Sequence, residues 1–143
     1  MTFIAIRSAL VTVITPVKTA AVVAEIYNYM PKNLPETPAI AIIDAPSGEV
    51  YSNTGENLLE IKYIIRCMVE DIKTSETSTQ ITTLLTVVDA VLAELRKVAN
   101  ASLESTSIYF MFENITETQE GVLEDITVLY KDIIITAHMF KSI

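Results

Sequence analysis

The most regular pattern in the chain is an alternation of apolar and polar residues over Leu59–Asp71. Successive side chains of a β-strand point to opposite faces of its sheet, so a period of two predicts one long strand with one buried face. Ile64 and Met68 are the exceptions on the polar side. The apolar side carries Leu59, Ile61, Tyr63, Ile65, Cys67 and Val69, and the polar side carries Glu60, Lys62, Arg66 and Glu70.

Near the N-terminus, apolar residues recur at steps of three and four, the period of a helix with one buried face. Thr2 can cap this helix. Pro16 has no N–H and clashes with the preceding turn, so we expect the helix to end near Ile14. Thr15 and Pro16 would then open a second helical piece that runs toward Tyr27, and a single kinked helix is the alternative. The periodic residues are Phe3, Ile6, Leu10, Val13 and Val17.

A second amphipathic helix follows the long strand. The segment Thr77–Gln80 has the Thr-x-x-Gln spacing of a capping box, which predicts a helix start. We expect this helix to end near Val98 and to pack flat on a sheet. Its apolar stripe consists of Ile81, Leu84, Leu85, Val88, Leu92 and Leu95.

Short apolar runs between turn residues predict further strands. Ala39–Asp44 is apolar on both faces, which is typical of a buried strand. The turns Ala45–Gly48 and Asn53–Gly55 enclose a short strand at Glu49–Ser52. Three prolines, Pro31, Pro35 and Pro38, predict that Met30–Thr37 is extended and crosses the surface.

The C-terminal third predicts two strands around an acidic turn. Ile108–Phe112 begins the first strand, and Thr116–Gly121 is expected to be the turn. Ile126–Phe140 reads as one long or broken strand. Asp132 lies in its middle and is expected to mark a bulge or an edge.

The predicted order is one or two helices, three strands, a helix and two strands. This order indicates an α+β fold: a mainly antiparallel sheet with one long amphipathic helix packed on a face and an N-terminal helix. A chain of 143 residues without repeats or low-complexity tracts is expected to form one domain over residues 1–143.

Charge and hydropathy limit the class of partner. The net charge is −8, from 18 acidic and 10 basic residues, which argues against a surface that grips nucleic acid or an anionic membrane. Ordinary acidic solubility explains this charge, and so does a wall past which DNA slides without adhering. The mean hydropathy of +0.40 exceeds what a lone domain of this size needs and suggests buried subunit interfaces.

The apolar N-terminal run Ser8–Val17 is too short for a membrane span of about 20 residues. Arg7 and the small residues downstream would also fit a signal peptide. We expect a cytoplasmic or assembled product rather than a secreted one.

No pattern of catalytic, cofactor-binding or metal-ligating residues stands out, so we expect the protein not to be an enzyme. Cys67 is the only cysteine and His138 the only histidine, which excludes a disulfide framework and a His-pair metal site. Cys67 is expected to act as a small apolar residue, and His138 to lie at the surface or core edge. Glu124 and Asp125 read as solvated loop charges.

Tyrosines beside prolines are the best candidates for an interface. Tyr27 and Tyr29 precede Pro31, and paired aromatic residues in such a position often anchor a contact. A packed corner that closes the crossing segment is an equal alternative. Tyr51, at the predicted tip, and the charged side of the long strand, Glu60, Lys62, Arg66 and Glu70, are further candidates.

The element order together with Tyr27, Tyr29, Pro31, Pro38 and Ala39 resembles the tail terminator (tail completion) proteins of long-tailed bacteriophages. That family begins with a helix and continues through a V-Y-x-Y-x-P … P-A-hydrophobic crossing. Here Ile26 stands where the family tends to carry Val, and the final strand is less regular.

The resemblance implies a structural virion protein, made in the host cytoplasm, that forms a ring, typically a hexamer, at the head-proximal end of the tail tube. Such a ring ends tube polymerisation and joins the tail to the neck. Its implied partners are other copies of the chain, the tail tube protein and a head–tail connector or stopper protein, with DNA only passing through the lumen and no membrane or cofactor.

Two other functions compete with this one. Another head–tail connector component, an adaptor or stopper, is the nearest. A small-ligand-binding regulatory α+β domain, with a pocket between Ile81–Val98 and the sheet, belongs to a different class.

Overall fold

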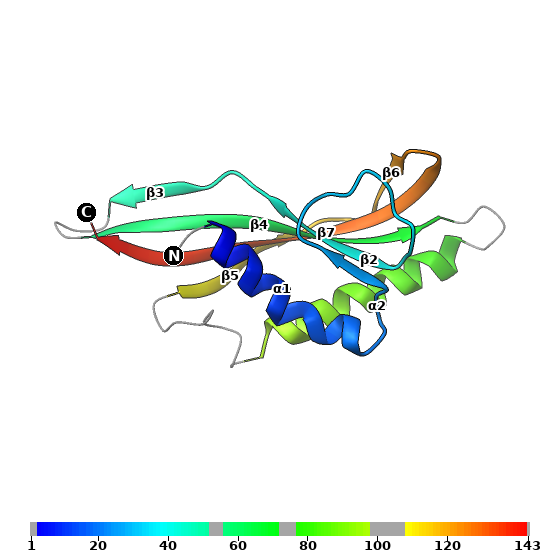
Figure 1. Cartoon of the computed structure of the whole chain (residues 1–143), viewed down its shortest axis with the longest axis horizontal. Helices are drawn as coiled ribbons and strands as arrows, with labels where there is room; N and C mark the ends of the chain where they lie inside the picture. The colour runs from blue at the N-terminus through cyan, green and yellow to red at the C-terminus, as the bar shows by residue number, and fades with distance from the viewer. Residues whose placement is uncertain (1–2, 52–55, 72–76, 98–107, 143) are drawn as a thin grey trace.

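Two long antiparallel strands form the axis of the fold in the computed structural model, which describes residues 3–51, 56–71, 77–97 and 108–142 (Figure 1). These are β4 (Glu56–Glu70) and β7 (Ile126–Ser142). Their register runs from Glu56 opposite Ser142 to Glu70 opposite Val128 without a shift. The long strand predicted from the alternation is therefore present, and its partner is the strand predicted at Ile126–Phe140.

The other strands attach to this pair and complete a seven-stranded sheet. The main order is β1-β2-β4-β7-β5, while β3 pairs with β4 and β6 pairs with β7. Among the described strands, only the pairing of β1 with β2 is parallel. The strands are β1 (Glu25–Tyr27), β2 (Ala39–Asp44), β3 (Gly48–Tyr51), β5 (Ile108–Ile115) and β6 (Gln119–Leu123).

Both helices, α1 (Phe3–Thr19) and α2 (Thr77–Leu95), lie on one face of the sheet (Figure 1). The predicted α+β class, with a mainly antiparallel sheet, is thereby confirmed. The alternation in β4 sends Ile61, Tyr63, Ile65, Cys67 and Val69 toward these helices, and each is at most 2% exposed. The helices contribute Ile6, Leu10 and Ile14 from α1, and Leu84, Val87, Val88, Val91, Leu92 and Leu95 from α2.

The prediction that the first helix ends near Ile14 is wrong, because α1 continues through Pro16 to Thr19. Pro16 lies in the last turn, where its own carbonyl still accepts a hydrogen bond from the N–H of Ala20 at 2.9 Å. Ala21 then takes a φ of 60°, the left-handed conformation that ends many helices. The N–H of Val22 reaches back to the carbonyl of Val17 at 3.1 Å.

Two strands were not predicted. The segment expected to continue as a helix toward Tyr27 contains β1, whose Glu25–Tyr27 pairs with Ala39–Ala41. The second half of the expected acidic turn at Thr116–Gly121 belongs to β6, which pairs with the start of β7. The chain reverses instead at Glu124 and Asp125, where Glu124 takes a φ of 52°. Both strands depend on partners supplied by another part of the sheet, so local pattern did not reveal them.

Asp132 marks neither a bulge nor an edge, since β7 runs through it in continuous register with β4. The irregularity lies in β5, between Phe112 and Asn114. The predicted turn Asn53–Gly55 lies outside the described residues. The predicted stripe of α2 holds except at Leu85, which is 43% exposed.

Within the described residues, α2 is long and apolar enough to cross a membrane by length and composition over Ser78–Leu95. A core helix of a globular protein passes the same test. The buried stripe of α2, packed against α1 and the sheet, is what such a core helix shows.

Native Cys67 should resist thiol reagents. Its side chain is fully buried on β4, and burial raises the pKa of this thiol to about 12. Because the thiolate is the reactive form, labelling by a water-soluble disulfide reagent at pH 8 should be at least about 100-fold slower in the folded protein than in urea. Fast labelling without denaturant would show that the sheet opens at β4.

The same burial predicts a loss of stability at alkaline pH. The pKa of Cys67 in the folded protein lies above that of an exposed thiol, which is about 8.5. This difference stabilises the folded state, and its full contribution is present below about pH 8.5. The contribution is lost as the pH rises toward about 12. Tyr63, whose pKa burial also raises, acts in the same direction. Urea unfolding at pH 8 and pH 10 should show the lower free energy of unfolding at pH 10, and Cys67→Ala should reduce that difference.

Candidate interaction surface

The face of the sheet opposite the helices carries its own smaller apolar cluster. Met68 was an exception to the alternation on the polar side of β4, and it is fully buried. Its cover is the crossing segment, defined here as residues 28–38, together with β6 and the start of β7 (Figure 1). The cluster consists of Leu34, Ala39, Ala41, Met68 and Val128. Met68, a long apolar side chain on the charged face of β4, was therefore a sequence signal that this second face is also covered.

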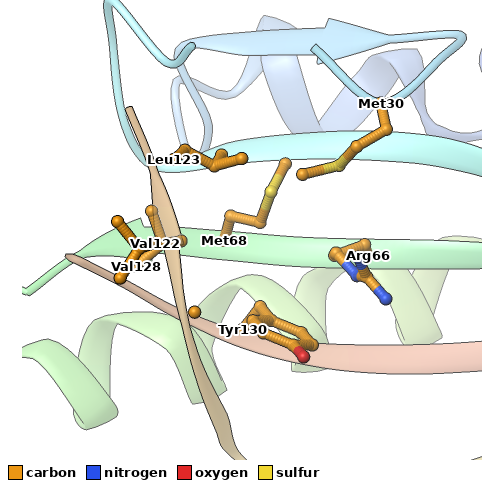
Figure 2. A pocket seen from close by; sticks show the side chains of 8 residues that line it. Met30, Arg66, Met68, Val122, Leu123, Val128 and Tyr130 are labelled. Carbon is orange, nitrogen blue, oxygen red and sulfur yellow. The ribbon is translucent and has the colours of Figure 1, made fainter. Parts of the chain in front are cut away.

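A hollow of about 160 Å³ remains between the crossing segment, β4, β6 and β7. Figure 2 shows the side chains of Met30 and Met68 reaching toward each other, with Arg66 and Tyr130 below them in the view. Val122 stands at the border and is 71% exposed. Flexible methionines and an exposed valine give this hollow an adaptable apolar lining.

A bidentate ion pair closes one side of this hollow. The Nε and Nη2 atoms of Arg66 donate to Oδ1 and Oδ2 of Asp132 at 2.8 and 3.0 Å. The guanidinium lies over the ring of Tyr130, with Cζ 4.4 Å from the ring centroid. The N–H of Asp132 donates to Oγ1 of Thr116 at 3.0 Å, which ties the loop before β6 to β7. Asp132 thus holds Arg66 in place rather than interrupting the strand.

The tyrosine pair lies where β1 passes into the crossing segment. The rings of Tyr27 and Tyr29 meet edge to face, with centroids 5.9 Å apart and planes at 71°. Tyr27 is half-buried, whereas Tyr29 is 57% exposed. Burial raises the pKa of Tyr27, and the charges of Glu25 and Glu36 add to that shift. Tyr27 therefore packs the corner, whereas Tyr29 is presented to solvent, and its role as an interface residue stays a prediction.

The end of α1 holds this corner in place. Nζ of Lys18 donates to Oε1 of Glu25 at 2.8 Å, and the N–H of Ile26 donates to the same oxygen at 3.0 Å. These two hydrogen bonds lower the pKa of Glu25. The N–H of Ala24 also donates to the carbonyl of Pro38 at 2.8 Å. Tyr27 consequently ends, and Tyr29 follows, a strand that is anchored to both α1 and β2.

The charged side of β4 lies as predicted. Glu60, Lys62 and Glu70 are half-buried on the same face of the sheet as Arg66. Tyr51 pairs with Asn57 through the backbone of β3, away from the crossing segment. The predicted candidates therefore fall in two places: the tyrosine corner with Arg66 near the crossing segment, and the β3–β4 end with Tyr51.

In the part of the chain that the structure describes, no group of three His, Cys, Asp or Glu residues could hold a metal ion. The space between α2 and the sheet, where a ligand pocket would lie in the regulatory-domain alternative, is filled by the buried core. Met30 and Tyr130 line the hollow, and buried Asp132 holds Arg66 beside it; none of these three residues was predicted to do so. A charged residue inside an apolar strand was the only signal for Asp132.

No family model and no curated protein matches this sequence. The structure is similar to a chain from the virion of a native gene transfer agent (GTA) particle, with a TM-score of 0.52 and 11% sequence identity. The likeness covers 92% of this chain and 84% of the other. At this identity the likeness shows that the two chains share a fold.

Removing one partner of the Arg66–Asp132 pair should destabilise the protein. Asp132 has a side chain only 8% exposed, and that of Arg66 is 24% exposed. Asp132→Ala leaves a half-buried guanidinium without its acceptor. We expect a loss of about 2–3 kcal/mol in the free energy of unfolding, somewhat less than for a fully buried pair.

Urea denaturation measures this loss, and the double variant Arg66→Met, Asp132→Leu provides the control. An apolar pair of similar size should recover most of the stability. A loss below about 0.5 kcal/mol for Asp132→Ala, the range of a surface substitution, would contradict the assigned role of this ion pair.

Proposed function

We propose that this protein is a structural component of a phage-type virion, and specifically a tail terminator that forms a ring on the head-proximal end of the tail tube. In this proposal it is not an enzyme. The ring ends tube polymerisation and joins the tail to the neck, and its partners are other copies of the chain, the tail tube protein and a connector or stopper protein.

The main support is the fold that the chain shares, over 92% of its length, with a chain of a gene transfer agent virion. That neighbour comes from a virion particle, which makes a particle component the best starting point for this chain as well. The residues of the crossing segment, with Tyr27, Tyr29, Pro31 and Pro38, favour the tail terminator family within that class.

The shape of the sheet agrees with an assembly role. Figure 1 shows the shared end of β3, β4 and β7 extending beyond both helices. At this end β4 is paired on both sides, by β3 and β7, and the edge without a partner among the described strands is the outer edge of β3. Natural proteins cover such edges with another element or another chain. In a ring, the neighbouring subunits and the tube would supply that cover.

The exposed tyrosine supplies an anchor for such contacts. Tyr29 is 57% exposed although its ring contacts Tyr27. A large aromatic side chain that is held by its neighbour loses little conformational entropy on binding, which suits it to the centre of an interface. The net charge of −8 is compatible with a lumen that DNA passes without adhering.

Tyr29→Ala should weaken assembly much more than it lowers stability. Because Tyr29 is 57% exposed, its truncation should cost less than about 1 kcal/mol of unfolding free energy. As an interface anchor it should contribute at least about 2 kcal/mol to binding, a loss of roughly 30-fold in affinity. Co-sedimentation with tail tubes assembled from the tube protein of the same genome measures the affinity, and thermal unfolding measures stability.

Leu85→Ala is the matched control, since it removes another exposed apolar side chain (43% exposed) from α2. It should leave tube binding unchanged. If Tyr29→Ala lost stability but bound tubes normally, Tyr29 would belong only to the packed corner. If the unaltered protein bound a purified connector ring but not tubes, the adaptor or stopper alternative would replace the terminator.

A further inference from the structure

Two strands on opposite sides of the sheet each have an open outer edge. At one end of the β4–β7 pair, β3 pairs with β4 and β5 pairs with β7. Among the described strands, none pairs with the outer side of β3 or of β5. One row of paired residues, Glu49, Leu59, Met139 and Ile108, crosses all four strands. The two open edges therefore belong to one four-stranded piece of sheet, with β4 and β7 between them.

The backbone groups that face outward from β3 follow from the register. Successive residues of a strand direct their N–H and C=O groups to opposite sides. The carbonyl of Lys62 accepts a hydrogen bond from the link between β2 and β3 at 3.2 Å, so the even-numbered residues of β4 face this side. Gly48 and Val50 lie opposite even-numbered residues of β4 and face it. The backbone groups of Glu49 and Tyr51 therefore face outward.

The same reasoning applies to β5. The carbonyl of Asp132 accepts a hydrogen bond at 2.9 Å from the segment that precedes β6, so the even-numbered residues of β7 face the β5–β6 side. Tyr109 and Met111 lie opposite even-numbered residues of β7 and face it. The backbone groups of Ile108 and Phe110 consequently face outward. Each edge thus presents N–H and C=O groups to which another strand can pair.

β5 lacks most of the features that protect an exposed edge. Natural edge strands are short, or they carry Lys, Pro or a bulge that prevents pairing with another chain. β5 has eight residues with no Lys, no Pro and one charged residue, Glu113. Its irregularity, between Phe112 and Asn114, leaves Ile108–Phe112 regular. A regular edge of this composition is expected to be covered by a strand of another chain.

We propose that the outer edge of β3 in one copy pairs with the outer edge of β5 in the next copy, so that the sheet continues from copy to copy. β3 and β5 run in opposite directions, because each neighbouring pair of the four strands is antiparallel. Copies related by a rotation about an axis near the strand direction keep this relation, and the contact is an antiparallel ladder.

The two edges are different parts of the chain, so the contact is heterologous. Repetition of a heterologous contact closes a ring when its rotation allows. This contact rests on the proposed function and names the surfaces that would hold such a ring together.

The sheet also suggests the register of the contact. Glu49 lies in the same row as Ile108, and in that register Tyr51 would lie beyond the start of β5. A shift of the next copy by two residues, about 7 Å along the strands, places Glu49 opposite Phe110 and Tyr51 opposite Ile108. All four residues of β3 then have partners, and outward-facing backbone groups meet. Closed sheets require such a shift, because their strands are tilted.

Proline substitution tests the contact at the backbone. A proline is tolerated on an edge strand where the N–H would face solvent, but it cannot donate to an added strand. Glu49→Pro should lower the association constant of the chain at least about 10-fold. Sedimentation velocity measures this constant, with the chain alone or on tail tubes. The melting temperature should fall by less than about 4 °C, because the pairing of β3 with β4 loses no donor.

Glu120→Pro is the matched control. It removes an outward-facing N–H from another edge strand, since Gln119 and Gly121 lie opposite even-numbered residues of β7. Its association constant should equal that of the unaltered chain. Equal losses from both prolines would mean that the effect does not come from the β3 edge, and the proposed contact would be overturned.

Disulfide formation tests the register without a proline. In the proposed ladder Val50 lies opposite Tyr109, and Cα atoms of such a pair are about 4.5–5.5 Å apart, a separation that a disulfide spans. Val50→Cys and Tyr109→Cys chains should form a disulfide-linked dimer under oxidation only when they are mixed. Val50→Cys mixed with Phe110→Cys is the control and should give none, because successive residues point to opposite faces. Native Cys67 is buried and does not compete.

The outcomes separate this contact from the proposed function. Assembly on tubes that Glu49→Pro does not weaken, without the disulfide, would overturn the β3–β5 contact and leave the terminator intact. Absence of self-association both in solution and on tubes would overturn the two together. Weaker association of Glu49→Pro without the disulfide would assign another partner to the β3 edge and would overturn the contact with β5. Val50→Cys chains that link to one another would show a symmetric contact and would also overturn it.

Discussion

The pairing of β4 with β7 is the constraint on which the rest of the structure depends. Fifteen residues of β4 follow one register along β7, and all the other described strands except β1, which pairs with β2, join one of these two. β2 and β3 join β4, and β5 and β6 join β7. Because side chains alternate along a strand, one uninterrupted register also fixes which residues face the helices over the whole length of the sheet.

The second face of the sheet shows how charges are accommodated once the register is set. Arg66 and Asp132 lie directly opposite each other on β4 and β7. The crossing segment and β6 cover both charged groups, and the ion pair ensures that neither is buried without a partner. Tyr130 packs against the guanidinium, and Met68 fills the space under the crossing segment. The same cover places Tyr29 at the surface, which connects the core of this face to the proposed interface.

The sequence predicted the elements whose burial is visible in their own pattern of apolar and polar residues. The alternation over Leu59–Asp71 and the buried run Ala39–Asp44 were confirmed, since periodicity reports burial directly. The break expected at Pro16 was wrong: a proline removes only the hydrogen bond to the carbonyl four residues before it, and the helix continues past it to Thr19. β1 and β6 were not predicted. They are three and five residues long, and strands this short form only when the edge of a neighbouring strand is already present.

For the interaction surface, the sequence alone identified the tyrosine pair, the charged side of β4 and the surplus of carboxylates. The tertiary structure decided which of these are available for contact. It joined Arg66 to Asp132, which lies 66 positions away in the chain, and left Tyr29 exposed. It also brought Arg7 of α1 beside Asn28–Met30. The physical reason is that composition and periodicity report whether a side chain prefers burial, whereas its partner is chosen by the packing of distant segments.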